Sequence, residues 1–186
     1  MGRQRSAGIA AAVLVAAGLI SGLAFTFAPK AASTRDGLAS KQLTFPLPES
    51  WRDGLRNSFN EKRGAKAHEA VDIMAPRGTP VYAVEDGRVA KLFKSVPGGK
   101  TIYQFDPSGK FAYYYAHLDR YAAGLIEGKE LRRGEVIGYV GSTGNAAPDA
   151  PHLHFAIFRL GPKREWWKGE AIDPYPYLAA PLPSSG

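Results

Sequence analysis

The chain has 186 residues, 45% of them hydrophobic, which suits one packed domain with a short extension and excludes a largely disordered protein. It contains no cysteine, which excludes a disulfide framework and a cysteine-ligated zinc site. The formal net charge is +7, but much of it lies in residues 1–45 and no basic stripe alternates with aromatic residues elsewhere. We therefore expect no nucleic-acid partner.

The first segment with a clear pattern is residues 6–28, an uncharged stretch that follows two arginines. As a helix it spans about 35 Å, which is enough to cross a bilayer core of about 30 Å. It has two interpretations, a cleaved signal peptide and an uncleaved signal anchor. Pro29 and Lys30 disturb the small-x-small pattern at the candidate cleavage sites, so we expect residues 1–28 to remain as a membrane anchor. The rest of the chain is then exported, to the periplasm or the extracytoplasmic face of the inner membrane.

Three further regions follow this segment. Residues 29–45 are small and polar and predict a linker. Residues 46–174 form the expected folded domain, which opens in an extended conformation at Phe45-Pro-Leu-Pro48 because proline disfavours helix in the residue before it. Residues 175–186 are rich in proline and predict a frayed tail.

The folded region has the pattern of a mainly β domain. Short apolar runs bounded by Gly, Pro, Asp or Ser predict six strands, over residues 79–83, 87–93, 101–105, 111–116, 135–140 and 153–158. Residues 85–87 and 97–100 resemble hairpin turns, and residues 118–125 allow one short turn of helix. We expect a small antiparallel sheet or sandwich, preceded by one N-terminal hydrophobic helix.

The histidines carry most of the chemical information. There are four, and all lie in three short segments: His68-Glu-Ala-Val-Asp72, Tyr115-Ala-His117 and Pro151-His-Leu-His154. Together these segments supply the nitrogen and oxygen ligands that zinc accepts. Residues four apart in a straight strand lie about 13 Å from each other. The chain must therefore bend between His68 and Asp72 if both are to bind one ion, and Ala70 is small enough to permit the bend.

The other two segments add imidazoles at defined positions. His152 and His154 are separated by one residue in an apolar strand, so both should face the same side, with Leu153 on the other. One can then bind a metal while the other contacts water or substrate. Tyr115 lies two residues before His117 and should share its face, which makes it a candidate substrate contact.

These fragments together resemble the LytM/lysostaphin-type zinc metallopeptidases, which cut peptide cross-links in bacterial peptidoglycan. The resemblance runs from about Asn60 to Phe158. The motifs that carry it occur in the expected order: His68-Glu-Ala-Val-Asp72-Ile-Met-Ala-Pro-Arg-Gly-Thr-Pro-Val81, Asp86-Gly-Arg-Val89, Tyr115-Ala-His-Leu118, Gly138-Tyr-Val-Gly-Ser-Thr-Gly-Asn145 and Pro151-His-Leu-His-Phe155.

The resemblance implies a role for each site residue. One zinc ion per domain would be bound by His68, Asp72 and His154, and His117 and His152 would be the catalytic pair beside the metal's water. The family fold it implies is a small antiparallel β domain with a groove across it. Two-histidine, one-carboxylate sites leave a fourth position open, which is typical of catalytic zinc. Which histidine acts as the general base stays open.

The sequence departs from the family pattern in two places. Ala70 stands where the family usually has glycine, and the loop from Asn145 to Pro151 is longer than in many members. This loop should reshape the groove wall, and Asn145 is a candidate substrate contact at its start. The substrate is thus expected to be a peptidoglycan peptide cross-link, although the bond that is cut stays open. The alternatives to an enzyme are a non-catalytic relative that activates another wall hydrolase and a plain zinc- or wall-binding module.

Overall fold

Residues 37–179 are described by the computed structural model, and in this range the chain is built mainly from strands. A 3-10 helix, η1 (Glu49–Gly54), precedes the strands, and one helical turn, α1 (Tyr175–Leu178), follows them. The strands are β1 (Leu55–Arg56), β2 (Lys62–Arg63), β3 (Lys66–Ala67), β4 (Val71–Met74), β5 (Pro80–Tyr82), β6 (Gly87–Ser95), β7 (Gly99–Phe105), β8 (Phe111–Tyr121), β9 (Glu130–Leu131), β10 (Val136–Val140), β11 (His152–Leu160) and β12 (Gly169–Ile172).

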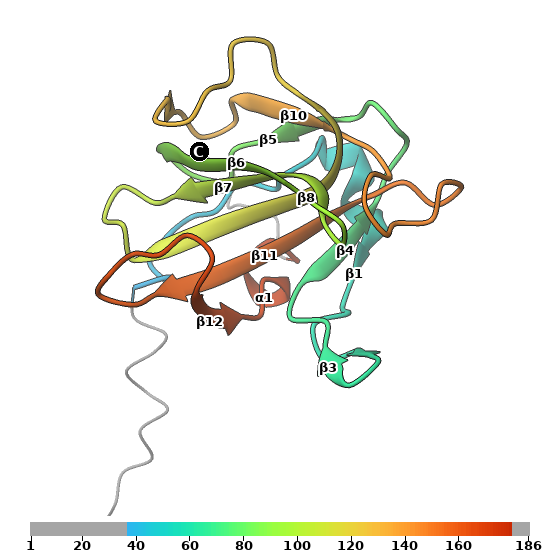
Figure 1. Cartoon of the computed structure of the whole chain (residues 1–186), viewed down its shortest axis with the longest axis horizontal. Helices are drawn as coiled ribbons and strands as arrows, with labels where there is room; N and C mark the ends of the chain where they lie inside the picture. Colours follow the sequence, from blue (N-terminus) through green and yellow to red (C-terminus); the bar gives the residue numbers. More distant parts are fainter. Residues whose placement is uncertain (1–36, 180–186) are drawn as a thin grey trace, which may run out of the picture. The chain divides into compact units, whose positions relative to one another are not determined.

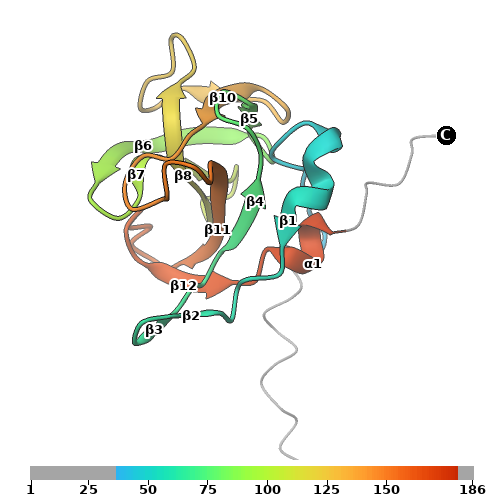
Figure 2. The same cartoon turned by 90° about the vertical axis from the view of Figure 1, so that its right-hand side faces the viewer.

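Most of the strands form one ten-stranded sheet, whose main path runs β1-β4-β11-β8-β7-β6-β9 (Figure 1). β10 pairs with both β8 and β5, and β12 pairs with the C-terminal half of β11. β2 and β3 form a separate hairpin that projects from the sheet just before β4 (Figures 1 and 2). Every strand pairing in the described range is antiparallel, which confirms the mainly β, antiparallel fold.

One face of the long strands builds the hydrophobic core. On β11, Leu153, Phe155 and Ile157 are fully buried, because alternate residues of a strand point to the same side. Burying a side chain of this size contributes roughly 1.5–3 kcal/mol. The alternation leaves His152 and His154 on the opposite face of the sheet, as the sequence predicted, where they are only partly covered.

The six predicted strands are all present, and several are longer than expected. β8 continues to Tyr121, which pairs with Gly138 of β10. The helical turn expected over residues 118–125 is therefore wrong: strand pairing occupies the backbone as far as Tyr121, and a tight turn follows, in which the Leu125 N–H donates to the Ala122 carbonyl.

The two predicted hairpin turns have different outcomes. Residues 97–100 lie at a hairpin between β6 and β7, in which Ser95 faces Gly99. Residues 85–87 also turn the chain, but they do not connect a hairpin, because β5 pairs with β10 and β6 pairs with β7 and β9. Residue composition identified the turn correctly but could not identify the partners of its flanking strands.

The folded domain extends beyond both expected boundaries. Leu38 and Leu43 lie in the predicted linker, yet both are buried in the core. At the other end, Leu178 belongs to the predicted tail but is 1% exposed, and Arg52 of η1 donates a hydrogen bond to its carbonyl group. Apolar residues from both segments thus belong to the core, so neither the linker nor the tail has the limits that composition suggested.

The predicted N-terminal hydrophobic helix and anchor, residues 1–28, lie outside the described residues. Among residues 37–179, no helix has the length and apolar character needed to cross a bilayer.

Candidate metal centre and active-site groove

A bend between β3 and β4 brings His68 and Asp72 together, as the sequence predicted. The bend is made by Glu69, whose φ of +56° lies in the left-handed region, while Ala70 is fully buried behind it. Two backbone hydrogen bonds secure it, from His68 to the Glu61 carbonyl at 2.8 Å and from Glu69 to the Phe59 carbonyl at 3.0 Å. The His68 Nε2 atom then lies 3.3 Å from Asp72 Oδ1.

Strand pairing supplies the third group. β4 and β11 are neighbours, and His154 lies directly opposite Asp72 in their register. His154 Nδ1 is 3.2 Å from Asp72 Oδ1 and 3.0 Å from His68 Nε2. One nitrogen from each histidine and one carboxylate oxygen therefore converge on a single point.

The spacing of these three atoms fits a zinc ion. A tetrahedral zinc with ligands about 2.0–2.2 Å away holds its ligand atoms roughly 3.3–3.6 Å apart. The observed separations of 3.0, 3.3 and 3.2 Å are close to that value. The charge states fit as well. Burial lowers the pKa of His154, which favours the neutral, metal-binding imidazole. Against the effect of its burial, the neighbouring imidazoles of His154 and His68 hold the pKa of Asp72 well below its usual range, so the group is a carboxylate.

Neighbouring groups orient these ligands. His68 Nδ1 is 3.2 Å from the Ser58 carbonyl oxygen, which can only accept, so the ring proton sits on Nδ1 and Nε2 faces the metal position. The Asp72 N–H donates to Ser58 Oγ at 3.2 Å. The second carboxylate oxygen of Asp72, Oδ2, accepts a hydrogen bond from Arg63 at 3.0 Å, which leaves Oδ1 as the single oxygen directed at the histidines.

His117 and His152 lie next to this centre. Their ring centroids are 4.9 Å apart, and the His117 centroid is 5.5 Å from that of His154. His117 Nδ1 is 2.8 Å from the Thr143 carbonyl, and His152 Nδ1 is 2.8 Å from the Ala150 carbonyl. Both rings therefore carry their proton on Nδ1 and keep Nε2 as the proton acceptor. Burial lowers the pKa of His117 to about 4, so its ring is neutral at pH 7.

Tyr115 does not lie in the groove, contrary to the sequence prediction. Its side chain is fully buried in the core, where its hydroxyl donates to Gln104 at 2.7 Å and accepts the Val84 N–H at 3.1 Å. The reason is the φ of +59° at His117, which interrupts the strict alternation on which the prediction rested. His117 therefore shares the groove face with Tyr114, whose ring centroid is 5.9 Å from that of His154.

The four histidines line a groove of about 570 Å³. Asn145 borders it, as the sequence predicted, together with Ala146, Ala147 and Ala150 of the same loop. This loop is held against the β6–β7 turn by a very close backbone contact. A Cβ atom on Gly144 would lie 2.3 Å from the Gly99 nitrogen, so only glycine fits there.

The groove also has two borders that the sequence did not single out. Arg63 and Lys66 of the β2–β3 hairpin lie beside His68. No hydrophobic alternation marks so short and exposed a hairpin, so only its position just before His68 could have indicated that these side chains approach the metal centre.

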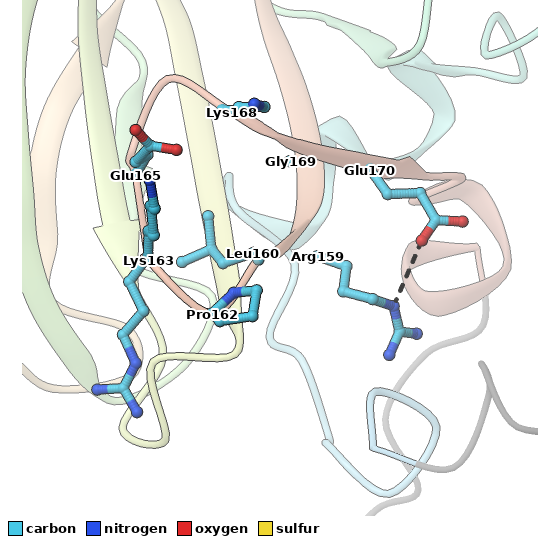
Figure 3. A pocket seen from close by; sticks show the side chains of 10 residues that line it. Arg159, Leu160, Pro162, Lys163, Glu165, Lys168, Gly169 and Glu170 are labelled. Carbon is cyan, nitrogen blue, oxygen red and sulfur yellow. Dashed lines mark ion pairs between the residues drawn. The ribbon is translucent and has the colours of Figure 1, made fainter.

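A second cavity, of about 690 Å³, lies at the connection between β11 and β12 (Figure 3). Its lining includes an ion pair between Arg159 and Glu170 at 3.8 Å, and the side chains of Leu160 and Pro162. None of the four histidines borders it. Although this cavity is larger than the groove, its lining does not include the metal-binding group or the two neighbouring histidines. The candidate active site is therefore the groove.

Comparison with known proteins agrees with this geometry. Residues 66–174 match Peptidase family M23. The L-Ala--D-Glu endopeptidase of Bacillus subtilis is 34% identical over 144 residues, which cover 73% of this chain and 43% of the relative. The peptidoglycan DD-endopeptidase ShyC of Vibrio cholerae is 32% identical over 133 residues, which cover 68% of this chain and 29% of the relative. The matched region thus spans less than half the length of each of these relatives.

A solved structure extends the agreement to the fold. The catalytic domain of lysostaphin from Staphylococcus simulans superposes with a TM-score of 0.59 at 27% identity, covering 72% of this chain and 99% of that domain. The match thus includes essentially the whole of a lysostaphin catalytic domain, and the family match covers more than half of this chain. The chain belongs to peptidase family M23, whose members include the LytM/lysostaphin-type peptidases.

Proposed function

We propose that this chain is a zinc-dependent endopeptidase that hydrolyses peptide cross-links of bacterial peptidoglycan. One observation carries the proposal. Three ligand atoms 3.0–3.3 Å apart meet in a groove, and two further histidines that do not belong to this ligand group line the same groove. The names of the relatives, an L-Ala--D-Glu endopeptidase and a peptidoglycan DD-endopeptidase, support the substrate class.

In this proposal His68, Asp72 and His154 hold the zinc ion. When bound, such an ion lowers the pKa of a water molecule at its open position and polarises a substrate carbonyl. The proton-transfer steps are carried out by His117 and His152. With its proton on Nδ1, each ring offers Nε2 to take a proton from the nucleophilic water and to return it to the leaving amine. The carbonyl groups of Thr143 and Ala150 fix the orientation of the two rings.

A non-catalytic, wall-binding role is the alternative that the sequence left open. A protein that had lost catalysis would no longer need the full set of ligands and proton-transfer groups. Here all five groups are present, and the backbone hydrogen bonds that orient His68, His117 and His152 are formed as well. This completeness favours the enzyme.

The test is incubation of the purified chain with peptidoglycan, followed by separation of the released muropeptides. We expect cross-linked dimers to be converted to monomers, conversion to stop with a chelator, and zinc to restore it. The zinc-loaded His117→Ala variant serves as a folded, inactive control. An unchanged muropeptide pattern with the chain bound to the wall would instead support the binding role.

We further propose that residues 6–28 anchor the protein, so that the domain acts in the periplasm or on the outer face of the inner membrane. The support is the length and uncharged character of this stretch, with two arginines before it. The intact mass of the protein from the membrane fraction tests this. A mature N-terminus between Ala24 and Ser40 would mean that a signal peptide is removed.

A further inference from the structure

Two segments that border the groove differ in charge. The β2–β3 hairpin contributes Arg63 and Lys66. The loop after Gly144 contributes uncharged residues: Asn145, Ala146, Ala147 and Ala150. The remaining charged residue among those that border the groove is Asp72, which belongs to the metal centre. The groove is therefore positive on its hairpin side, and a divalent ion at the centre adds to that charge.

Arg63 lies close enough to the metal centre to contact a bound substrate. Its guanidinium is 3.0 Å from Asp72 Oδ2, which places it within about 7 Å of the point that the ligand atoms surround. One residue of extended peptide covers roughly 3.5 Å. A group on either of the first two residues from the scissile bond can therefore reach Arg63.

Both cations are available to a ligand. Apart from Asp72, the partner of Arg63 is Glu61 at 3.2 Å, and both side chains of that pair are more than half exposed. Exposed pairs of this kind contribute little, so a substrate group can replace Glu61. Lys66 is exposed, and its side chain makes no hydrogen bond or ion pair with any residue between 37 and 179.

We propose that Arg63 and Lys66 make the enzyme selective for peptides that carry a free carboxylate within two residues of the scissile bond. The inference rests on the proposed function and narrows its substrate. A guanidinium fork can bind a carboxylate through two parallel hydrogen bonds, and a lysine adds a mobile point charge. A glycine bridge offers no such group. Family membership does not decide between a peptide with a free carboxylate and a glycine bridge, because the relatives include both an L-Ala--D-Glu endopeptidase and a glycyl-glycine endopeptidase.

The experiment uses two synthetic cross-link peptides that differ only in carrying a carboxylate or a carboxamide on the residue next to the scissile bond, with a polyglycine peptide as a third substrate. We expect kcat/KM of the full chain to be roughly 10-fold or more higher for the carboxylate peptide, since hydrogen bonds to charged groups are the stronger ones. Cleavage of the polyglycine peptide should be slower still.

The variants assign the selectivity to the hairpin. Lys66→Gln and Arg63→Gln should each reduce the carboxylate preference several-fold, and the double variant should abolish it. Lys62→Gln is the matched control, because Lys62 lies in the same hairpin but does not border the groove. Since Arg63 also contacts Asp72, zinc content is measured for every variant, and Lys66→Gln tests selectivity without touching a ligand.

A binding measurement separates this inference from the proposed function. The same peptide pair is titrated into the zinc-loaded His117→Ala variant, in which turnover is suppressed. If the wild-type chain cuts no peptide but this variant still prefers the carboxylate, the selectivity stands and the endopeptidase proposal fails. Equal kcat/KM for the two peptides in the wild type, or equal effects of Lys66→Gln and Lys62→Gln, would overturn the selectivity.

Discussion

Two histidines in the same groove, His154 and His117, differ in what their nitrogen atoms face. His154 Nδ1 points at Asp72 and His68, whereas His117 Nδ1 is occupied by the Thr143 carbonyl. We therefore expect His154→Ala to lose both zinc and activity. His117→Ala should keep its zinc and lose about 10²- to 10⁴-fold in kcat, the usual contribution of general acid–base catalysis. Zinc content by metal analysis and muropeptide release measure the two effects.

The two variants control each other, since both remove one imidazole from the same groove. His152→Ala belongs with His117→Ala in this scheme and should also retain the metal. If His117→Ala released the zinc while His154→Ala retained it, the roles assigned to the two rings would be reversed.

Tyr115 provides a second test at single-residue scale, because the sequence placed it in the groove and the structure places it in the core. Tyr115→Phe leaves Val84 N–H and Gln104 without their partner, at a cost of about 1–3 kcal/mol in the free energy of unfolding. Catalysis should be almost unchanged. Urea unfolding and kcat/KM test both expectations. Tyr82→Phe is the control, since its hydroxyl makes no hydrogen bond within residues 37–179. A large loss of activity without a loss of stability would mean that Tyr115 acts in the groove, as the sequence predicted, and not in the core.

At the scale of strands and loops, the sequence predicted correctly those features that follow from the regular alternation of side chains along a strand. The alternation in β11 placed His152 and His154 on one face correctly, because the side-chain period of a strand is 2. The bend after His68 was also predictable, since a straight strand would keep His68 and Asp72 about 13 Å apart. What periodicity could not give was the neighbour of each strand. That β4 lies beside β11, with Asp72 opposite His154, depends on the tertiary fold.

The wrong predictions, for Tyr115 and for the two ends of the domain, arise where side-chain periodicity is interrupted or absent. Tyr115 was misplaced because a non-glycine residue, His117, adopts a φ of +59°, which no residue pattern signals. Leu38 and Leu178 were assigned to the linker and to the frayed tail because the surrounding residues, small and polar in one case and rich in proline in the other, show no period. They are nevertheless buried, and both belong to the hydrophobic core.

The loop that carries Asn145 can be tested through its glycine. Gly144 has a φ of +80° and approaches Gly99 closely, whereas Gly134 has a φ of +78° with no atom within 4 Å of an added Cβ. Gly134→Ala should therefore cost only the strain of the left-handed backbone, roughly 1–2 kcal/mol. Gly144→Ala should cost more and should also reduce activity, because the adjacent Thr143 carbonyl orients His117. Urea unfolding and kcat/KM compare the two variants. Equal effects of the two substitutions would show that the close contact is unimportant.

At the scale of the whole domain, an ion-pair network connects Lys41, in the segment before η1, to Glu85 and Asp106. Lys41 Nζ lies 2.6 Å from Glu85 and 3.1 Å from Asp106. Burial alone would raise the pKa of Asp106, but hydrogen bonds from Ser108 and Phe111 and the Lys41 ammonium lower it. A carboxylate with a lowered folded-state pKa stabilises the fold above its unfolded-state pKa of about 3.9, and that stability is lost as the pH falls through its folded-state pKa.

We therefore expect the free energy of unfolding to fall below about pH 4, and to fall less steeply in Asp106→Asn, which has no carboxylate to protonate at this position. Urea unfolding between pH 2.5 and about 6, at fixed ionic strength, measures the slope. Both proteins are treated with chelator first, so that loss of zinc does not contribute to the difference. Identical slopes would mean that Asp106 titrates alike in the folded and unfolded chain.

Removal of the metal gives the final prediction, because the ligands come from β11, β4 and the bend before β4, which only the folded domain brings together. Zinc that binds the folded chain alone stabilises it by RT ln(1 + [Zn]/Kd), about 4 kcal/mol at 1,000 times Kd. For a domain of this size that corresponds to roughly 10 °C in Tm. Thermal unfolding with saturating zinc and with chelator should show this difference in the wild-type chain and in His117→Ala. The difference should be absent in His154→Ala, whose site has lost a ligand. A wild-type Tm that does not respond to chelator would mean that His68, Asp72 and His154 do not hold the ion.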